Sequence, residues 1–212
     1  MVAQSSRLHR RSCKLEACAT FLGLKKIGVY GGTFDPIHCA HLILAREALE
    51  QLELERVIFI PAALSPHKLS LTPTPARDRV EMLRLALEGE PGFELDEIEV
   101  NRPPPSFTID TIEKLRQRDR ELEISYLLGS DNLPRLDTWH RIEELRGLVK
   151  FVVLERGQTA EDSSYPTIRR QLDISATDIR NRVATGHSIR YLVPPAVEEF
   201  IRRRRLYQDL NR

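Results

Sequence analysis

The residue types best suited to chemistry are concentrated in one short stretch, Gly31-Gly32-Thr33-Phe34-Asp35-Pro36-Ile37-His38-Cys39-Ala40-His41. Its two glycines let backbone N–H groups approach an anion closely. His38 and His41 are three residues apart, so on a helix both imidazoles would share one face of the first turn. Free N–H groups and the helix dipole favour phosphate at such a position. The stretch therefore predicts a site that binds a phosphorylated ligand.

The elements that would position this stretch are a strand and a helix. The apolar run Ile27-Gly28-Val29-Tyr30 precedes it, and apolar residues continue after it at helical spacing. Asp35-Pro36 is a suitable helix start, because Asp is a good N-cap and Pro fits the first turn. We therefore expect a strand, a tight loop at Gly31 and Gly32, and a helix that begins at Asp35-Pro36.

A second phosphate-binding segment is predicted near the C-terminus. Ser175 and Thr177 stand at the start of a helical pattern, where their hydroxyls can cap the helix and contact phosphate oxygens. Arg180 lies on the same first turn and can clamp phosphate through two parallel hydrogen bonds. This segment would form another anion site at a helix N-terminus.

Two single residues are further candidates. Lys68 lies in a loop after the apolar run 57–60, so it would leave the C-terminal end of a parallel strand, where open α/β sheets bind ligands. Asp131 stands between the apolar run 124–128 and a helix start. It fits either a helix cap or a hydrogen bond to the ribose or phosphate of a ligand.

Strand and helix patterns alternate along the chain. Apolar runs predict strands at 27–30, 57–60, 93–100 with a bulge, 124–128 and 151–154. Helical patterns follow Thr74-Pro75 and Pro105-Ser106, run from 174 to Gly186, and recur within 188–207, whereas the polar segment 156–167 predicts a surface loop. We expect an α/β fold with a Rossmann-like open parallel sheet and helices on both faces. It would form one domain over residues 25–212, preceded by an N-terminal extension of residues 1–24.

Composition narrows the class of partner. The 32 basic and 31 acidic residues give a formal charge of +1, which argues against nucleic-acid binding. No apolar run reaches the length of a membrane span, so we expect a protein that does not bind membranes. The three cysteines have no disulfide or zinc-ligand spacing, which favours a reducing cytoplasm. The sequence leaves the oligomeric state open, a homo-oligomer included.

Five blocks in order resemble the bacterial nicotinate-mononucleotide adenylyltransferases of the nucleotidyltransferase superfamily. They are Lys26 to His38, Ser65-Pro66-His67-Lys68, Pro105 to Thr111, Gly129 to Trp139, and Ile174 to Arg180 with Ser188 to Pro194. The resemblance covers residues 25–208. It implies that ATP and nicotinate mononucleotide react to give deamido-NAD and pyrophosphate.

The resemblance also implies roles for single residues. His38, His41, Lys68 and Arg180 would act on the triphosphate, and the ATP site would comprise Gly31, Gly32, Thr33, Phe34, His38, His41, Asp131, Ser175, Thr177 and Arg180. The Trp139 ring would stack on the pyridine, while backbone N–H groups of Thr108 and His140 hold the nicotinate carboxylate. Mg²⁺ would arrive with ATP, with no metal site of the protein's own.

The chemistry fits these residues without a general base. The acceptor phosphate has a second pKa near 6 and is mostly dianionic at neutral pH, so it is already a nucleophile. Three departures from the family pattern stand out: Ala40 and Ala176 replace the usual Gly and Ser, and Ser65 replaces the usual Pro. Adenylyl transfer to nicotinamide mononucleotide or phosphopantetheine is the alternative within this class. A non-catalytic nucleotide-binding regulator is the alternative outside it.

Overall fold

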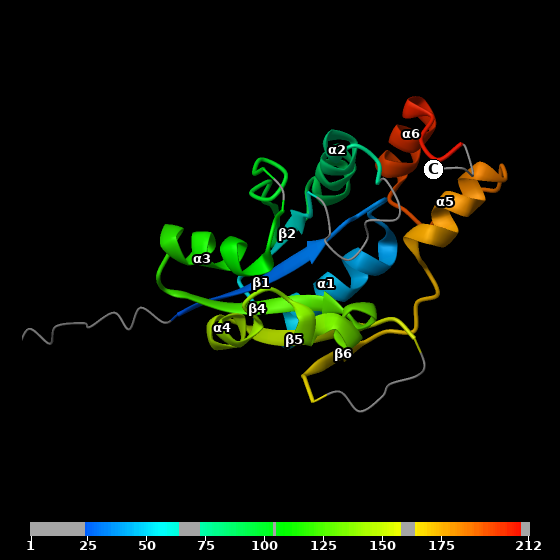
Figure 1. The fold of residues 1–212 in the computed structure, drawn as a ribbon. Helices are drawn as coiled ribbons and strands as arrows, with labels where there is room; N and C mark the ends of the chain where they lie inside the picture. Colours follow the sequence, from blue (N-terminus) through cyan, green and yellow to red (C-terminus); the bar gives the residue numbers. More distant parts are fainter. Residues whose placement is uncertain (1–23, 64–72, 104, 158–163, 209–212) are drawn as a thin grey trace, which may run out of the picture.

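A six-stranded parallel sheet forms the centre of the protein (Figure 1). The computed structural model describes residues 24–63, 73–103, 105–157 and 164–208. Its strands are β1 (Lys25–Gly32), β2 (Arg56–Pro61), β3 (Phe93–Leu95), β4 (Leu122–Gly129), β5 (Lys150–Glu155) and β6 (Thr167–Arg169). They lie in the order β3-β2-β1-β4-β5-β6, and each neighbouring pair is parallel. The strand order therefore reverses between β1 and β4.

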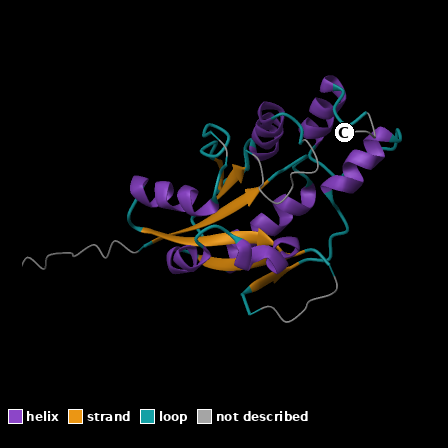
Figure 2. Cartoon of the chain, viewed as in Figure 1, coloured by secondary structure: helices purple, strands orange, loops and turns teal. Residues whose placement is uncertain are grey.

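Helices cover both faces of this sheet, as the sequence predicts (Figure 2). They are α1 (Cys39–Gln51), α2 (Ala76–Leu87), α3 (Thr108–Arg118), the 3-10 helix η1 (Ser130–Thr138), α4 (Ile142–Leu148), α5 (Ala176–Ala184) and α6 (Pro195–Arg204). One core holds side chains of α1, α2, α5 and α6, and the other holds side chains of α3, η1 and α4. The fold class is confirmed.

The sequences of the strands are continuous apolar runs because both faces of the sheet are buried. In β1, Ile27 and Val29 belong to the core under α3 and α4, whereas Tyr30 belongs to the core under α1 and α2. The same alternation separates Tyr126 from Leu127 in β4. Among the described residues, no helix combines the length and apolar composition that crossing a membrane requires. Residues 1–23 lie outside the described ranges, so the N-terminal extension stays a prediction.

Two expectations about strands are wrong. The strand expected over 93–100 ends at Leu95, because the Asp96 carboxylate accepts a hydrogen bond from the backbone N–H of Ile98, 2.9 Å away, and turns the chain. At the other edge of the sheet, β6 begins at Thr167, where the sequence predicted the end of a surface loop. β6 has only three residues, which are too few to show a periodic pattern in the sequence.

The first helix also begins later than expected. α1 starts at Cys39 with His38 as its N-cap, and β1 continues through Gly32, so the glycines belong to the strand rather than to a loop. The Asp35 carboxylate does not cap α1, since it accepts hydrogen bonds from the Thr74 N–H and the Tyr207 hydroxyl. Both partners are distant in sequence.

The helix stops, in contrast, follow local rules. Gly89 and Gly186 lie just beyond α2 and α5, and both have positive φ angles that favour glycine. α2 begins at Ala76, with Pro75 in the N-cap position. α6 is shorter than the expected span of 188–207, and Pro195 is its first residue, as suits a residue without an N–H.

Candidate active site

The predicted site residues of the described chain gather where the strand order reverses. Gly31 and Gly32 end β1, and Gly129 ends the adjacent strand β4. In open α/β sheets ligands bind beyond the carboxyl ends of the strands at such a reversal. Figure 1 shows α5 in orange and α6 in red beyond the end of the sheet toward which the β1 arrow points. The site is therefore assembled from both halves of the chain.

The two histidines form a stacked pair at the start of α1. Their ring centroids are 3.6 Å apart with an interplanar angle of 23°. The His41 Nδ1 atom accepts a hydrogen bond of 3.3 Å from the backbone N–H of His38. The His38 side chain is fully buried, and within the described structure neither of its ring nitrogens has a hydrogen-bond partner. An unpaired buried imidazole is costly, so a bound ligand or water would stabilise it.

The electrostatics of His38 make it a neutral donor. Burial, followed by the positive charge of Arg156, lowers the pKa of His38 to about 3. The ring is therefore uncharged at neutral pH. It can donate one hydrogen bond to a phosphate oxygen, and a fixed positive charge must come from other residues.

Arg180 brings the two predicted phosphate segments together. Its Nη1 atom donates a hydrogen bond of 2.7 Å to the backbone carbonyl of Asp35, and its Nη2 atom lies 3.2 Å from the Thr177 hydroxyl. The Ser175 hydroxyl accepts a hydrogen bond of 3.1 Å from the Asp178 N–H, which confirms Ser175 as the N-cap of α5. Arg180 of α5 thus contacts the loop that leads into α1.

That loop, residues 33–38 between β1 and α1, is called the phosphate loop below. Its Phe34 has a positive φ of 49° and a buried ring in edge contact with the rings of Tyr30 and His41, at centroid distances of 5.4 and 5.2 Å. The Phe34 side chain therefore belongs to the core. Any contact of Phe34 with ATP would therefore be made by its backbone.

A second group of predicted site residues packs on the face of the sheet opposite α1. The Trp139 ring lies edge-on to the rings of Tyr126 and Phe151, at 5.8 and 6.3 Å, and His140 lies over Phe107 at 4.3 Å. Phe107 is the N-cap of α3, so the next residue, Thr108, has a first-turn N–H that no helical carbonyl can accept. The structure thus brings together the three residues predicted to hold the acceptor, Thr108, Trp139 and His140.

Tyr126 connects these side chains to β1. Its hydroxyl forms a hydrogen bond with the side chain of Thr108, and burial, reinforced by the negative charge of Glu99, raises the pKa of Tyr126 well above its ordinary value. A methyl group on Gly31 would lie 2.4 Å from the same hydroxyl. Gly31 is therefore required for the close approach of Tyr126 to β1, a reason that the sequence did not reveal.

Asp131 lies just beyond the carboxyl end of β4. It is an exposed residue of the first turn of η1, and its negative charge contributes to the raised pKa of Tyr30, mainly a result of burial. A methyl group on Gly129 would lie 2.5 Å from an Asp131 carboxylate oxygen, so the carboxylate folds back over the end of β4. Lys68, with the Ser65-Pro66-His67 segment before it, lies outside the described residues.

Arg156 is a site residue that sequence reasoning missed, because its polar surroundings were interpreted as a surface loop. It directly follows β5, and its Nη1 atom donates a hydrogen bond of 3.0 Å to the carbonyl of Ile174, one residue before the N-cap of α5. Its charge acts on both His38 and Tyr30. The signal available in the sequence was its place at the end of a parallel strand, the argument applied to Lys68.

A family model and curated relatives both match this chain. The model of the cytidylyltransferase-like family matches residues 29–182. A probable nicotinate-nucleotide adenylyltransferase of Geobacillus thermodenitrificans is 43% identical over 185 residues, covering 86% of this chain and 86% of the relative. The nicotinate-nucleotide adenylyltransferase of Bacillus subtilis is 35% identical over 189 residues, covering 88% of this chain and all of the relative. The chain belongs to the nicotinate-nucleotide adenylyltransferase family.

A solved structure supports the fold of this family member. The Plasmodium falciparum nicotinic acid mononucleotide adenylyltransferase complexed with NaAD superposes with a TM-score of 0.72 at 21% identity, over 87% of this chain and 98% of that one. Two departures from the family pattern now have a structural context. Ala40 is buried in the first turn of α1, and Ala176 is the first residue of α5, so both are small side chains in helices.

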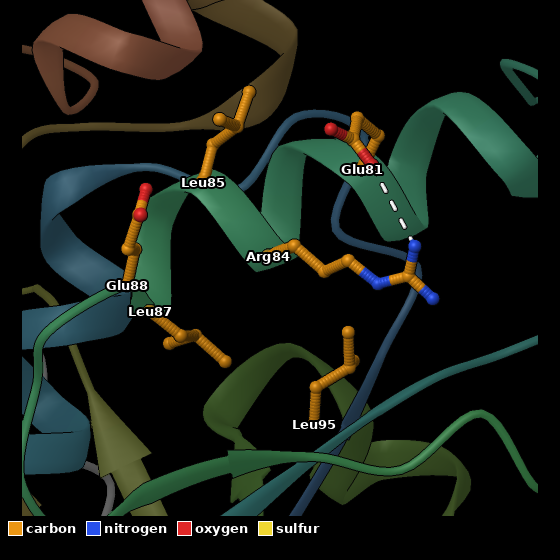
Figure 3. A pocket seen from close by; sticks show the side chains of 6 residues that line it. All are labelled: Glu81, Arg84, Leu85, Leu87, Glu88 and Leu95. Atoms are coloured by element: carbon orange, nitrogen blue, oxygen red, sulfur yellow. Dashed lines mark ion pairs between the residues drawn. The ribbon is translucent and has the colours of Figure 1, made fainter.

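A surface pocket of this family member lies away from these residues. Figure 3 shows a shallow pocket at the outer edge of the sheet, lined by Glu81, Arg84, Leu85, Leu87, Glu88 and Leu95 of α2, its C-cap and β3. No predicted site residue lines it. In the described part of the chain no group of three or more His, Cys, Asp or Glu side chains is arranged to hold a metal ion.

Proposed function

We propose that this protein transfers the adenylyl group of ATP to nicotinate mononucleotide, giving deamido-NAD and pyrophosphate. The names of its curated relatives and the arrangement of the site support the proposal. The observation that carries it is the 2.7 Å hydrogen bond from Arg180 to the carbonyl of Asp35. This bond joins the first turns of α5 to the loop that leads into α1, an arrangement that suits the binding of a polyphosphate.

The reaction is a phosphoryl-type transfer in which positioning matters most. The phosphate of nicotinate mononucleotide attacks the α-phosphorus of ATP, a P–O bond forms, and the bond to the pyrophosphate leaving group breaks. Both reactants are polyanions, so the site must hold them in line and stabilise the charge that develops on pyrophosphate. The proposal requires no base from the protein.

On the ATP side, we assign the charge stabilisation to Arg180, Lys68 and Arg156. We also assign hydrogen bonds to phosphate oxygens to His38 and His41, with His38 acting as a neutral imidazole because its pKa is lowered. We further assign to the ATP site the backbone groups of residues 31–34 and the hydroxyls of Ser175 and Thr177. Asp131 is assigned to the ribose. A divalent cation enters as part of the nucleotide substrate, and Mg²⁺ suits triphosphate because it prefers phosphate oxygens and water.

On the acceptor side, the ring of Trp139 stacks on the pyridine and the N–H groups of Thr108 and His140 bind the carboxylate. The edge contacts of Trp139 with Tyr126 and Phe151 fix the ring before the ligand arrives. Backbone donors favour a carboxylate over an amide, because the NH₂ group of an amide would face them unpaired. The site is therefore proposed to prefer the acid form of the acceptor.

The direct test is product formation by the purified protein. With ATP, Mg²⁺ and nicotinate mononucleotide, we expect equimolar pyrophosphate and a dinucleotide with the mass of deamido-NAD. The His41→Ala variant should fold normally and turn over at least about a hundredfold more slowly, the loss typical of one transition-state donor. A wild-type protein that binds ATP and releases no pyrophosphate would point to a nucleotide-binding regulator instead.

A further inference from the structure

Arg79 is a buried cation that reaches out of the core toward the site. Arg79 is only 1% exposed. Its guanidinium donates hydrogen bonds to three backbone carbonyls, those of Thr33 at 2.7 Å, Thr74 at 2.9 Å and Ala63 at 3.4 Å. Burial lowers the pKa of Arg79, and the negative charge of Asp35 opposes that shift. A buried guanidinium with three carbonyl partners is costly to form and leaves little freedom of movement.

The three carbonyls belong to the segments that border the phosphates in the proposed function. Thr33 begins the phosphate loop. Ala63 follows β2 and Thr74 precedes α2, so they flank residues 64–72, which include Lys68. One side chain thus joins the loop after β1 to both ends of the connection after β2.

Asp35 is the second centre of this network. Its two carboxylate oxygens accept hydrogen bonds from the Tyr207 hydroxyl at 2.6 Å and from the Thr74 N–H at 3.0 Å, while its backbone carbonyl accepts the bond from Arg180. Tyr207 stands just beyond the end of α6, with a positive φ of 61°. Its hydroxyl pKa is raised by burial and by the charge of Asp35, so it stays a proton donor.

A second hydrogen bond joins the end of α6 to α2. Arg204, at the end of α6, donates a hydrogen bond of 3.0 Å to the carboxylate of Asp78, the neighbour of Arg79 on α2. Asp78 is itself buried. The C-terminal segment is therefore attached to α2 by one contact and to the phosphate loop by another.

We propose that Arg79 and Tyr207 are positioning residues for adenylyl transfer, acting on the phosphate loop through its backbone and through Asp35. Neither side chain touches the substrate in this proposal, which rests on the proposed function. Their hydrogen bonds end on the loops at the carboxyl edge of the sheet, so their loss should disturb the geometry of ATP binding more than the stability of the core. A displacement of about 1 Å at such a site can lower a rate about a hundredfold.

The test compares Tyr207→Phe, Arg79→Lys and Arg79→Met with wild type. Tyr207→Phe removes one hydroxyl and leaves the ring, so the variant should fold. We expect its kcat/KM for ATP to fall about tenfold, as for loss of one hydrogen bond to a charged group, with the KM for the acceptor unchanged. Arg79→Lys keeps the charge and should retain more activity than Arg79→Met. Arg84→Met, on the exposed side of the same helix, is the matched control and should behave as wild type.

Thermal unfolding and binding of a non-hydrolysable ATP analogue complete the test. All rates use the acceptor that wild type turns over fastest, so that a wrong acceptor does not mask the result. Wild-type kinetics in Tyr207→Phe would overturn the proposal. So would equal losses in both Arg79 variants that follow their melting temperatures and affect ATP and acceptor alike. Absence of activity in wild type would instead refute the proposed function, and the ATP-analogue affinities would still test the positioning role.

Discussion

A methyl group on Gly31 would lie 2.4 Å from the Tyr126 hydroxyl oxygen and 3.3 Å from the ring carbon that carries it. The Tyr126 ring is buried in edge contact with Trp139 and Phe151, so it cannot move aside freely. We predict that Gly31→Ala lowers the free energy of unfolding by about 1–3 kcal/mol, the usual cost of overpacking. Chemical denaturation measures the change.

Combination with Tyr126→Phe shows whether the hydroxyl is the cause. In that background the nearest remaining atom is at a distance that a small shift can accommodate, so the cost of Gly31→Ala should fall by about 1 kcal/mol or more. Gly28→Ala is the matched control. Its methyl group would meet Leu54, Val57 and Leu127 on the other face, at 3.0–3.3 Å. An equal cost of Gly31→Ala with and without the hydroxyl would show that another contact is responsible.

His38 should give the protein a pH-dependent stability. Its pKa is about 3 when folded and returns to the ordinary 6.5 on unfolding. Between these values only the unfolded chain binds the proton, so unfolding becomes easier as the pH falls through this window. The free energy of unfolding should drop by up to about 1.4 kcal/mol per pH unit from this residue, and the effect vanishes above about pH 7.5.

The His38→Gln variant isolates this contribution from those of the carboxylates. Relative to that of the variant, the unfolding free energy of wild type should fall as the pH is lowered from about 6 to about 5. It should stay constant relative to the variant between about pH 7.5 and pH 8.5. Arg156→Gln should raise the pKa of His38, which NMR titration of the imidazole can follow. A constant difference across the whole range would mean that folded His38 titrates normally.

The Trp139 ring should affect one substrate only. We predict that Trp139→Ala raises the KM for nicotinate mononucleotide by about 10–100-fold, through lost stacking, with the KM for ATP nearly unchanged. Trp139→Phe keeps an aromatic face and the contacts with Tyr126 and Phe151, so it should recover most of the loss. Steady-state kinetics with each substrate varied in turn gives both constants. A rise in the KM for ATP of the same size would place Trp139 outside the acceptor site.

Local sequence patterns were sufficient to predict the main strands and helices and the positions of the two predicted phosphate-binding segments. The apolar runs of β1, β2, β4 and β5 are buried on both faces, which makes them visible without periodicity. Gly89 and Gly186 marked helix ends because their positive φ angles are a local requirement. The spacing of His38 and His41 likewise predicted that the two rings lie on one side of the helix start, where the structure shows them stacked.

Contacts between distant residues could not be predicted in this way. Asp35 resembles a helix cap in sequence. Its carboxylate instead accepts hydrogen bonds from Thr74 and Tyr207, which are 39 and 172 positions away in the chain. Arg79 lies on a helix that reads as amphipathic, and only the folded chain shows its guanidinium among three carbonyls. The tertiary contacts of Asp35 therefore displaced the start of α1 from the position that propensity favoured.

Acceptor selectivity tests the proposed function most directly. Pyrophosphate release can be measured with ATP and, in parallel, nicotinate mononucleotide, nicotinamide mononucleotide and phosphopantetheine. The N–H groups at Thr108 and His140, with the ring of Trp139, predict the highest kcat/KM for nicotinate mononucleotide, by at least about tenfold over the nicotinamide form. Phosphopantetheine has no pyridine to stack and should be slowest. Equal or faster turnover of the nicotinamide form would contradict the account of carboxylate recognition.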